Sequence, residues 1–512
     1  MIKNPILRGF CPDPSIIKAR GMYYIAVSTF EWWPGVRLFE SSDLKNWKQI
    51  RSPLTRRSQL DLIGVPSSGG VWAPCLSFDG DRFYLVYTDV KTKKGRFYNT
   101  NNYVVWTDDI YSSWSEPVYL NSIGFDPSLF HDSDNRKYLV NMINGFKGIT
   151  VQELDPKTLK PAGERKTVYT GSGLGCLEGP HIYHIDEYYY LIAAEGGTGY
   201  DHCVTMARSD SLYGPYITCP DNPLLTSDKG RGLQKCGHGD IVRADNNRWY
   251  LVHLCARPKS AGCVLGRETA IQELEFTNEK YFIPKGGTHV ACDQIEEAEG
   301  LPEYKESDER DIIDLFDEAC INVRYSSLRW DYNNFAHIDT GKKRLSMRGE
   351  ESLNSLHNVS LLAMRQTEHL CTAETVMHFT PSAFEHLAGL VYIYDNLNWY
   401  MMGKTLSEEG KTVLVVLKSD KGEIRDITEP VPVPEDTAIT LRIKTDGTSV
   451  FFSYRLEGDY ISLDAAGTTE ILTDEYCRGF TGAHFGMYVH DMLEKKARAF
   501  FDSFCIRYSD GE

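Results

Sequence analysis

Several common features are absent from this sequence. No run of about 18 apolar residues occurs, so a helical membrane span is not expected. The first ten residues, MIKNPILRGF, lack the apolar core of a secretory signal peptide, because Pro5 and Arg8 interrupt them. There is no CxxC pair, and the 13 cysteines are scattered, mostly in apolar contexts. We therefore expect structural thiols in a reducing, cytoplasmic location.

Basic residues are also in deficit, with 55 Lys and Arg against 71 Asp and Glu, a net charge of −16. Proteins that follow a phosphate backbone normally carry the opposite sign, so nucleic acid is not an expected partner. Because no long apolar run occurs, a membrane is not an expected partner either. The content of hydrophobic residues (42%) and charged residues (25%) is that of a folded globular protein. A length of 512 residues predicts two or three domains.

Aromatic residues are frequent, and many of them belong to an internal repeat. Each copy has a short polar or Pro-containing motif, an apolar pair, a polar turn and an aromatic-Tyr-aliphatic segment. The second aromatic residues stand at 24, 84, 138, 190 and 250, which are 60, 54, 52 and 60 residues apart. The turns within the copies, such as Asp79-Gly80-Asp81 and Asp245-Asn246-Asn247, are typical of β-hairpins.

Five such copies, each followed by further short strands, predict an all-β fold that begins with a five-bladed β-propeller over residues 1–295. The alternative is a β-sandwich in which the Tyr pairs recur by coincidence. After about residue 285 the period is lost, and charged segments, Glu296–Gly300 and Lys305–Asp311, predict a solvated connector. Apolar and alternating runs at 412–418, 438–444 and 450–454, separated by turns, then predict an antiparallel β-sandwich over residues 312–512.

Carboxylates recur where each copy opens. The equivalent positions are Asp13, Ala73, Asp126, Glu178 and Asp240, and the first strand of a propeller blade lines the central channel. Asp before Pro-Ser is also a common turn opener, which is the structural alternative for any single copy. Carboxylates that converge in a concave site raise at least one pKa, and an acid paired with a base is what glycoside hydrolysis requires.

Two aromatic residues are candidates for the walls of a sugar site. Trp72 precedes the second copy, and Phe30 ends the second strand of the first. Aromatic faces stack on the apolar faces of sugars, but they also fill cores, so packing is the alternative for both.

At these residues the sequence resembles the β-xylosidases of glycoside hydrolase family 43, including enzymes with α-L-arabinofuranosidase activity. The resemblance runs through both predicted domains, and its motifs are specific only in combination. They are NPILRGFCPDPS (4–15), STFEWWPGV (28–36), SSGGVWAP (67–74), GFDPSLF (124–130), EGPH (178–181), EGGTGY (195–200), GHGD (237–240) and LGRETA (265–270).

The resemblance implies roles for individual residues. Asp13 would be the general base that activates water, Glu178 the general acid, and Asp126 the residue that sets the orientation and pKa of the acid. The family inverts, which implies a separation of roughly 6.5–9.5 Å between acid and base. Arg267 would bind hydroxyls of the terminal sugar, with a surface ion pair as its alternative, and Thr198 is a further candidate for substrate binding.

His238 would lie over the channel axis beneath the sugar. No cofactor is expected to be required and no metal ligand is firmly assigned. Some relatives hold a calcium-centred water cluster in this place, so a Ca2+ ion near His238 is the alternative to a hydrogen-bonded core histidine.

In the family the sandwich (a concanavalin-like jelly roll) supplies an aromatic loop that closes the active-site pocket of the catalytic propeller. Gly479–Ala483 fits that loop, with Phe480 as the aromatic residue. A closed pocket admits only a chain end, which implies exo-hydrolysis of β-1,4-xylo-oligosaccharides to xylose. The resemblance also implies a homo-oligomer, a tetramer or a dimer.

One segment departs from the family. Relatives commonly carry Trp shortly after Val-Asn-Met in blade three, whereas here Val140–Met142 continues into the shorter, Trp-free segment Ile143–Gly148. A missing aromatic wall would widen the pocket or change the sugar preference. The alternatives are therefore an enzyme that acts mainly as an α-L-arabinofuranosidase and, from another class, a non-catalytic carbohydrate-binding propeller.

Overall fold

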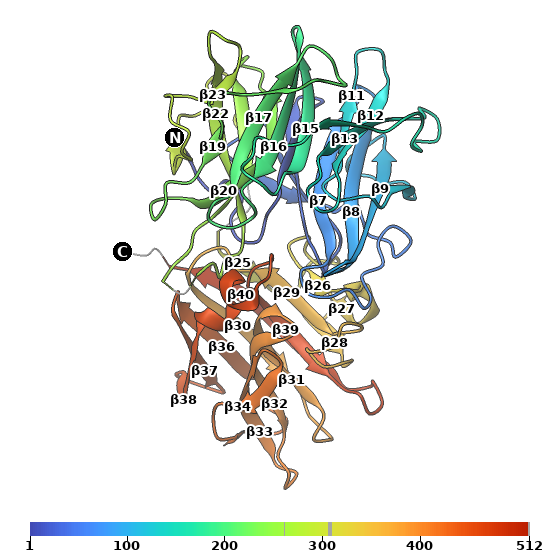
Figure 1. Ribbon diagram of the computed structural model, residues 1–512. Coiled ribbons are helices and arrows are strands. Elements are labelled where there is room, and N and C mark those ends of the chain that lie inside the picture. Colours follow the sequence, from blue (N-terminus) through green and yellow to red (C-terminus); the bar gives the residue numbers. More distant parts are fainter. Residues whose placement is uncertain (261, 306–309, 510–512) are drawn as a thin grey trace.

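The computed structural model describes residues 1–260, 262–305 and 310–509, and it confirms the predicted fold class (Figure 1). Helical segments in these ranges are limited to η1 (Tyr332–Asn334), η2 (Thr469–Leu472) and α1 (Asp474–Cys477). None of the helices in the described chain has the length and apolar character needed to cross a membrane. None of the 13 cysteines, all of which lie in the described ranges, forms a disulfide, and most are buried.

Five antiparallel blades form the upper part of the molecule in Figure 1. Blade one consists of β2 (Ser15–Ala19), β3 (Met22–Val27), β5 (Arg37–Ser41) and β6 (Lys48–Ile50). Blade two consists of β7 (Gly70–Phe78), β8 (Phe83–Lys94), β9 (Phe97–Thr107) and β10 (Val118–Asn121). Blade three consists of β11 (Ser128–His131), β12 (Lys137–Met142), β13 (Ile149–Leu154) and β14 (Lys166–Tyr169). Blade four consists of β15 (Glu178–Ile185), β16 (Tyr188–Glu195), β17 (Cys203–Ser209), β18 (Ile217–Thr218) and β19 (Leu225–Thr226). Blade five consists of β20 (Gln234–Arg243), β21 (Trp249–Ala256), β22 (Glu268–Phe276) and β23 (Phe282–Pro284).

The repeated tyrosines are a feature of the core. In each blade the second aromatic residue of the repeat lies on the second strand, paired with the first, and all five side chains are buried (Tyr24, Tyr84, Tyr138, Tyr190 and Tyr250). The repeat therefore marks the inner hairpin of each blade.

The start of the chain closes the ring of blades. Strand β1 (Ile2–Lys3) pairs with β24 (Gln294–Ile295), which follows blade five. The Asn4 side chain donates to Ile271 O and accepts from Ile271 N in blade five. The first residues are thus held against the last blade.

The sandwich forms the lower part of Figure 1 and consists of two antiparallel sheets. The first has β25 (Ile312–Asp314), β27 (Ala336–Asp339), β28 (Arg344–Arg348), β30 (Leu370–His378), β36 (Ile439–Asp446), β37 (Ser449–Arg455), β38 (Ile461–Thr468) and β40 (Arg498–Tyr508). The second has β29 (Leu361–Arg365), β31 (Leu387–Asp395), β32 (Asn398–Leu406), β33 (Thr412–Asp420), β34 (Glu423–Asp426), β35 (Val431–Pro432) and β39 (His484–His490). The runs predicted at 412–418, 438–444 and 450–454 correspond to β33, β36 and β37.

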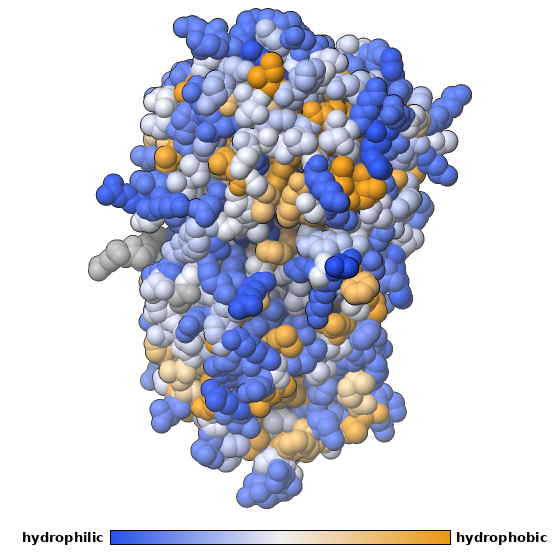
Figure 2. Space-filling model, viewed as in Figure 1, coloured by the Kyte–Doolittle hydropathy of each residue, from blue (hydrophilic) through white to orange (hydrophobic). Residues whose placement is uncertain are grey.

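The two parts are joined by backbone pairing as well as by side chains. Strand β4 (Trp32–Trp33), in blade one's loop, pairs with β26 (Ser327–Leu328) from the sandwich side. The buried Arg329 donates its backbone N–H to Glu31 O and its Nε–H to Val65 O. Seen as in Figure 1, hydrophobic residues gather on the lower half of the propeller, above this junction, and hydrophilic residues cover most of the remaining face (Figure 2).

The predicted connector is partly docked. Glu297 accepts hydrogen bonds from Lys45 at 2.6 Å and from the N-terminal ammonium at 2.9 Å. Residues 306–309, the middle of its second charged segment, lie outside the described residues.

Candidate active site

Each blade has a residue with a positive φ angle within its first strand or two places before that strand begins. These angles are 54° at Asp13, 30° at Ala73, 51° at Asp126, 56° at Gly179 and 45° at His238. Four of the five residues are not glycine, although this backbone region is unfavourable for residues with a Cβ atom. Such strain persists only where the surrounding structure enforces it, and it is found most often at functional sites.

Strand pairing shows that these five positions are equivalent. In every blade the residue two places later pairs with the second strand, as Ser15 does with Ala26 and Asp240 with Val252. The equivalence expected from the sequence is therefore wrong in the last two blades, where Gly179 and His238 take the places assigned to Glu178 and Asp240. The sequence motif does not reveal the backbone bulges in these strands.

Asp240 is buried and is not among the residues that line the cavity with Asp13, Asp126 and Glu178. Its carboxylate accepts from the backbone N–H of Ile16 at 2.8 Å and from the hydroxyl of Tyr183. These bonds tie blade five to blades one and four, which is a structural role.

The bulges also explain why neighbouring residues face the same cavity. Consecutive side chains of a regular strand point to opposite faces, but register shifts interrupt the pairing beside Trp72 and Glu178. Trp72 and Glu178 precede the positive-φ residue of their blades, as Phe125 does in blade three, and all three line one cavity together with Asp13 and Asp126.

This cavity has a volume of about 510 Å³. Every site residue predicted from the sequence lines it: Asp13, Phe30, Trp72, Asp126, Glu178, Thr198, His238, Arg267 and Phe480. They come from the strands and loops of all five blades and from the sandwich, so the fold brings the whole predicted set together.

Asp13 is held as a carboxylate. Burial alone would raise its pKa, but the Arg267 guanidinium, the His238 ring and the Ser28 hydroxyl outweigh burial and keep the pKa below its usual value. Ser28 Oγ donates to Asp13 Oδ2 at 2.7 Å, and Arg267 Nη1 lies 3.3 Å from Oδ1. An ionised carboxylate at this place is suited to accept a proton from water.

Glu178 has the opposite character. Burial and the negative charge of Asp13 raise its pKa to about 8, although Arg267 opposes the shift. Burial, together with the charges of Glu178 and Asp13, raises the pKa of Asp126 well above its usual value. At neutral pH the pair Asp126 and Glu178 therefore retains at least one proton, beside an ionised Asp13.

Asp126 also supports the backbone of the acid. Its Oδ2 accepts the N–H of Gly179 at 3.0 Å, in the peptide unit that follows Glu178. A Cβ at Gly179 would come within 2.8 Å of the His238 ring, and φ there is 56°. Glycine is thus required next to Glu178 by both conformation and space.

Two buried histidines, His238 and His202, lie close enough to Asp13 to affect its pKa. Burial lowers the pKa of His238 to about 4 and that of His202 to about 3, so both rings are neutral at pH 7. Within the described ranges, no three His, Cys, Asp or Glu side chains gather as ligands for a metal ion. The Ca2+ ion considered near His238 therefore stays a prediction, and we derive no step through a metal.

Arg267 connects the base to the sandwich. Its Nη1 donates to Thr198 Oγ1 at 2.9 Å and its Nη2 to the carbonyl of Phe480 at 3.0 Å. The backbone N–H of Phe480 in turn donates to Ser68 Oγ of blade two's loop at 3.0 Å. One guanidinium thus contacts blade one, blade four and the closing loop.

The aromatic walls meet around Phe480. Its ring centroid lies 6.2 Å from that of Phe30 and 6.1 Å from that of Trp72. Phe30 is only 2% exposed, so it supplies an edge of the floor, whereas Trp72 and Phe480 are partly exposed and offer larger surfaces.

The Trp-free segment of blade three does contribute an aromatic residue. Phe146, in the turn between β12 and β13, lines the cavity and packs against Phe125, with ring centroids 6.2 Å apart. Neither phenylalanine was predicted as a site residue. The available signal for Phe146 was an aromatic residue in a segment typical of a turn, Asn144-Gly145-Phe146-Lys147-Gly148, and its side chain is 41% exposed.

Three cations that line the same cavity, Lys93, Lys94 and Arg478, were not predicted either. The available signal for the two lysines was a basic run, KTKKGR (91–96), in an acidic chain, and no comparable run marks Arg478.

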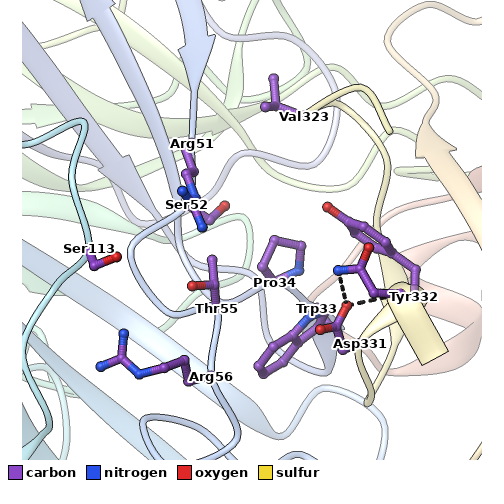
Figure 3. Close-up of a pocket in the computed structure, with 11 residues that line it drawn as sticks. Trp33, Pro34, Arg51, Ser52, Thr55, Arg56, Ser113, Val323, Asp331 and Tyr332 are labelled. Atoms are coloured by element: carbon purple, nitrogen blue, oxygen red, sulfur yellow. Dashed lines mark hydrogen bonds between the residues drawn. The ribbon is translucent and has the colours of Figure 1, made fainter. Parts of the chain in front are cut away.

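A second cavity, of about 280 Å³, lies at the junction of propeller and sandwich (Figure 3). Thr55 and Arg56 of the propeller face Asp331 and Tyr332 across it. Its one lining carboxylate among the described residues, Asp331, accepts the backbone N–H of Asn333 and caps η1. This cavity lacks an acid–base pair, so the larger one is the candidate active site.

Comparisons with known proteins agree with this geometry. Residues 2–282 match the family model Glycosyl hydrolases family 43, and residues 313–507 match the Beta xylosidase C-terminal Concanavalin A-like domain. The chain is 41% identical to Xylosidase/arabinosidase 43B of Humicola insolens (99% of this chain, 97% of the relative) and 40% identical to a Beta-xylosidase of Bacillus subtilis (96% of each). The solved structure of a xylan beta-1,4-xylosidase from Bacillus halodurans superposes with a TM-score of 0.96 at 41% identity, over 99% of this chain and 100% of that one.

Proposed function

The chain belongs to glycosyl hydrolases family 43, and from that premise we propose that this glycoside hydrolase is an inverting exo-β-1,4-xylosidase that releases xylose from xylo-oligosaccharides. The arrangement that carries the proposal is Asp13, which Ser28 and Arg267 contact and whose pKa is held below its usual value, in one cavity with Glu178, whose pKa is raised by burial and by Asp13. The names of its relatives support xylose-containing substrates.

In the proposed reaction, the terminal xylose enters the cavity up to its floor. Asp13 accepts a proton from a water molecule as that water attacks the anomeric carbon. Glu178 donates its proton to the glycosidic oxygen, so the leaving sugar departs as an alcohol. Asp126 holds the peptide unit after Glu178, and no cofactor takes part.

Exo action follows from the closure of the cavity. Phe480 packs against Phe30 and Trp72 and is fixed by Arg267 and Ser68. We propose that this loop blocks the path a continuing sugar chain would need beyond the terminal xylose.

The second candidate function is α-L-arabinofuranosidase activity. The combined name of the Humicola insolens relative favours it, and Phe146 gives this chain its own wall in blade three. The rates on an aryl β-xyloside and on the matching aryl α-L-arabinofuranoside decide between them. We expect the xyloside to be hydrolysed faster, and a strong preference for the arabinofuranoside would contradict the proposal.

Inversion has a separate test. An NMR time course on xylobiose should show α-xylose as the first product, and β-xylose as the first product would refute an inverting mechanism. Prior treatment with a chelator should leave the initial rate unchanged. Light scattering would test the expected homo-oligomer.

A further inference from the structure

The active-site cavity is lined by three cations that form no ion pair with any carboxylate in the described part of the chain. Lys93 and Lys94 reach it from the β8–β9 hairpin, and Arg478 reaches it from the end of α1. We call these three residues the cationic rim. Its occurrence in a chain with a net charge of −16 calls for a physical reason.

The rim differs in solvent exposure from the catalytic residues, which form the floor of the cavity. Asp13, Asp126 and Arg267 are all buried, whereas Lys94 and Arg478 are exposed. The terminal sugar of a substrate would occupy the floor, so the rim faces the leaving-group side.

Each rim cation is free of an anionic partner. Lys93 Nζ donates to the carbonyl of Ser68 at 3.2 Å and lies 4.1 Å from the ring centroid of Phe480. Throughout the described chain, no carboxylate lies within ion-pair distance of Lys93, Lys94 or Arg478. By contrast, Lys91 of the same hairpin is paired with Asp89 at 2.8 Å.

The absence of a partner is costly for the half-buried Lys93. Burial, together with the positive charge of Arg267, lowers the pKa of Lys93 to about 8, and the charge of Glu31 offsets this shift only in part. An anion bound at the rim would remove that penalty. The hairpin also supplies Tyr98, which is paired with Lys93 and lines the cavity, as a further surface for a sugar.

We propose that the cationic rim binds a carboxylate on the leaving-group side of the substrate, so that xylo-oligosaccharides carrying a uronic acid next to the scissile bond are preferred. Neutral xylose offers no charge to three unpaired cations, whereas one uronate does. The inference rests on the proposed exo-xylosidase function and names the substrate class of that site.

The test compares two aryl β-xylosides of nearly the same shape. One has a 4-carboxyphenyl leaving group, which is an anion at pH 7, and the other a neutral 4-carbamoylphenyl group. The ratio of their kcat/KM values is measured for the wild type and for Lys94→Gln, Arg478→Gln and the double variant. The change of this ratio between proteins is the readout, because the intrinsic reactivities of the two leaving groups cancel.

We expect each single variant to lower the ratio about twofold to fivefold, the range for a partly exposed charge pair, and the double variant to lower it further. For the wild type the ratio should also fall between about 0.01 M and about 1 M salt, as the Debye length shortens from about 30 Å to about 3 Å. The control is Lys157→Gln, an exposed lysine remote from the cavity in the β13–β14 turn, which should leave the ratio unchanged.

The outcomes separate the two proposals. Turnover of both xylosides with a ratio that responds neither to the rim variants nor to salt would overturn the uronate inference alone. Failure of the wild type to hydrolyse either xyloside would overturn the proposed function and this inference with it. A salt-dependent ratio that the rim variants do not change would place the effect elsewhere and would likewise overturn the inference.

Discussion

Glu178→Gln removes the titrating group of the proposed acid while preserving its shape, and its consequences can be worked out from the site. With a pKa of about 8, about nine-tenths of Glu178 is protonated at pH 7 and about one-tenth at pH 9, so wild-type kcat/KM should fall about tenfold between these values. At acidic pH, kcat/KM should fall as Asp13 becomes protonated, and the pKa of Asp13 lies below its usual value. The profile of the wild type should therefore be bell-shaped with its maximum below pH 8.

Glu178→Gln should have a lower kcat/KM than the wild type, and its kcat/KM should no longer fall at alkaline pH. General acid catalysis contributes about 10²–10⁴-fold, so kcat/KM on xylobiose should fall by that factor. The loss should be much smaller on a 4-nitrophenyl xyloside, whose leaving group departs without a proton. A variant that keeps an alkaline limb near pH 8, or loses the same factor on both substrates, would refute the assignment of Glu178.

Thermal unfolding shows whether Glu178→Gln is still folded. The direction in which the substitution changes stability follows from the pKa shift of Glu178. The fold raises the pKa of Glu178 from its model-compound value of 4.5 to about 8, so the stability that its proton confers is complete below pH 4.5 and is lost as the pH rises towards 8. Gln does not titrate, so Glu178→Gln should gain stability relative to the wild type over that interval. A variant that is inactive but no less stable at pH 7 has lost chemistry and not its fold.

Two further substitutions test the supports of the site. Lys235→Met breaks a buried ion pair with Asp474, whose side chains are each 6% exposed, and should lower the unfolding free energy by about 3–5 kcal/mol. Lys229→Met, which breaks an exposed pair, should cost at most about 1 kcal/mol, and equal shifts in melting temperature would contradict the difference. Gly179→Ala should reduce kcat at least about tenfold, because a Cβ there must displace the His238 ring, and an unchanged kcat would show that the ring yields freely.

The architecture could be predicted from the sequence because each blade repeats the same residue types at the same positions. A buried tyrosine at a fixed place in each inner hairpin is a packing requirement, so it recurs five times and can be counted. The positions of the carboxylates at the channel mouth follow from the same repeat in blades one and three, where Asp-Pro-Ser opens the strand.

The remaining features depend on backbone geometry that no single residue type signals. Ala73, Asp126 and His238 adopt positive φ angles without being glycine, and Gly179 is the one glycine among the five equivalent positions. Residue type therefore does not identify these positions, and the shifted equivalence in blades four and five could not be predicted. In the same way, the run of lysines after Asp89 indicates a basic segment, but only the twelve-residue length of β8 brings Lys93 and Lys94 over the cavity.

The site as a whole is an assembly of both parts of the chain. Arg267 of the loop before β22 contacts Asp13, Thr198 and the Phe480 carbonyl, so any movement of the sandwich loop is transmitted to the guanidinium that holds the pKa of Asp13 down. Lys235, bonded to Asp474 and Glu475 just before that loop, fixes it to blade five. Closure of the cavity and ionisation of the proposed base are therefore coupled, and Lys235→Met should shift the acid limb of the pH profile upwards as well as lower the melting temperature. An unchanged acid limb in a folded Lys235→Met variant would show that Arg267 holds Asp13 independently of the sandwich.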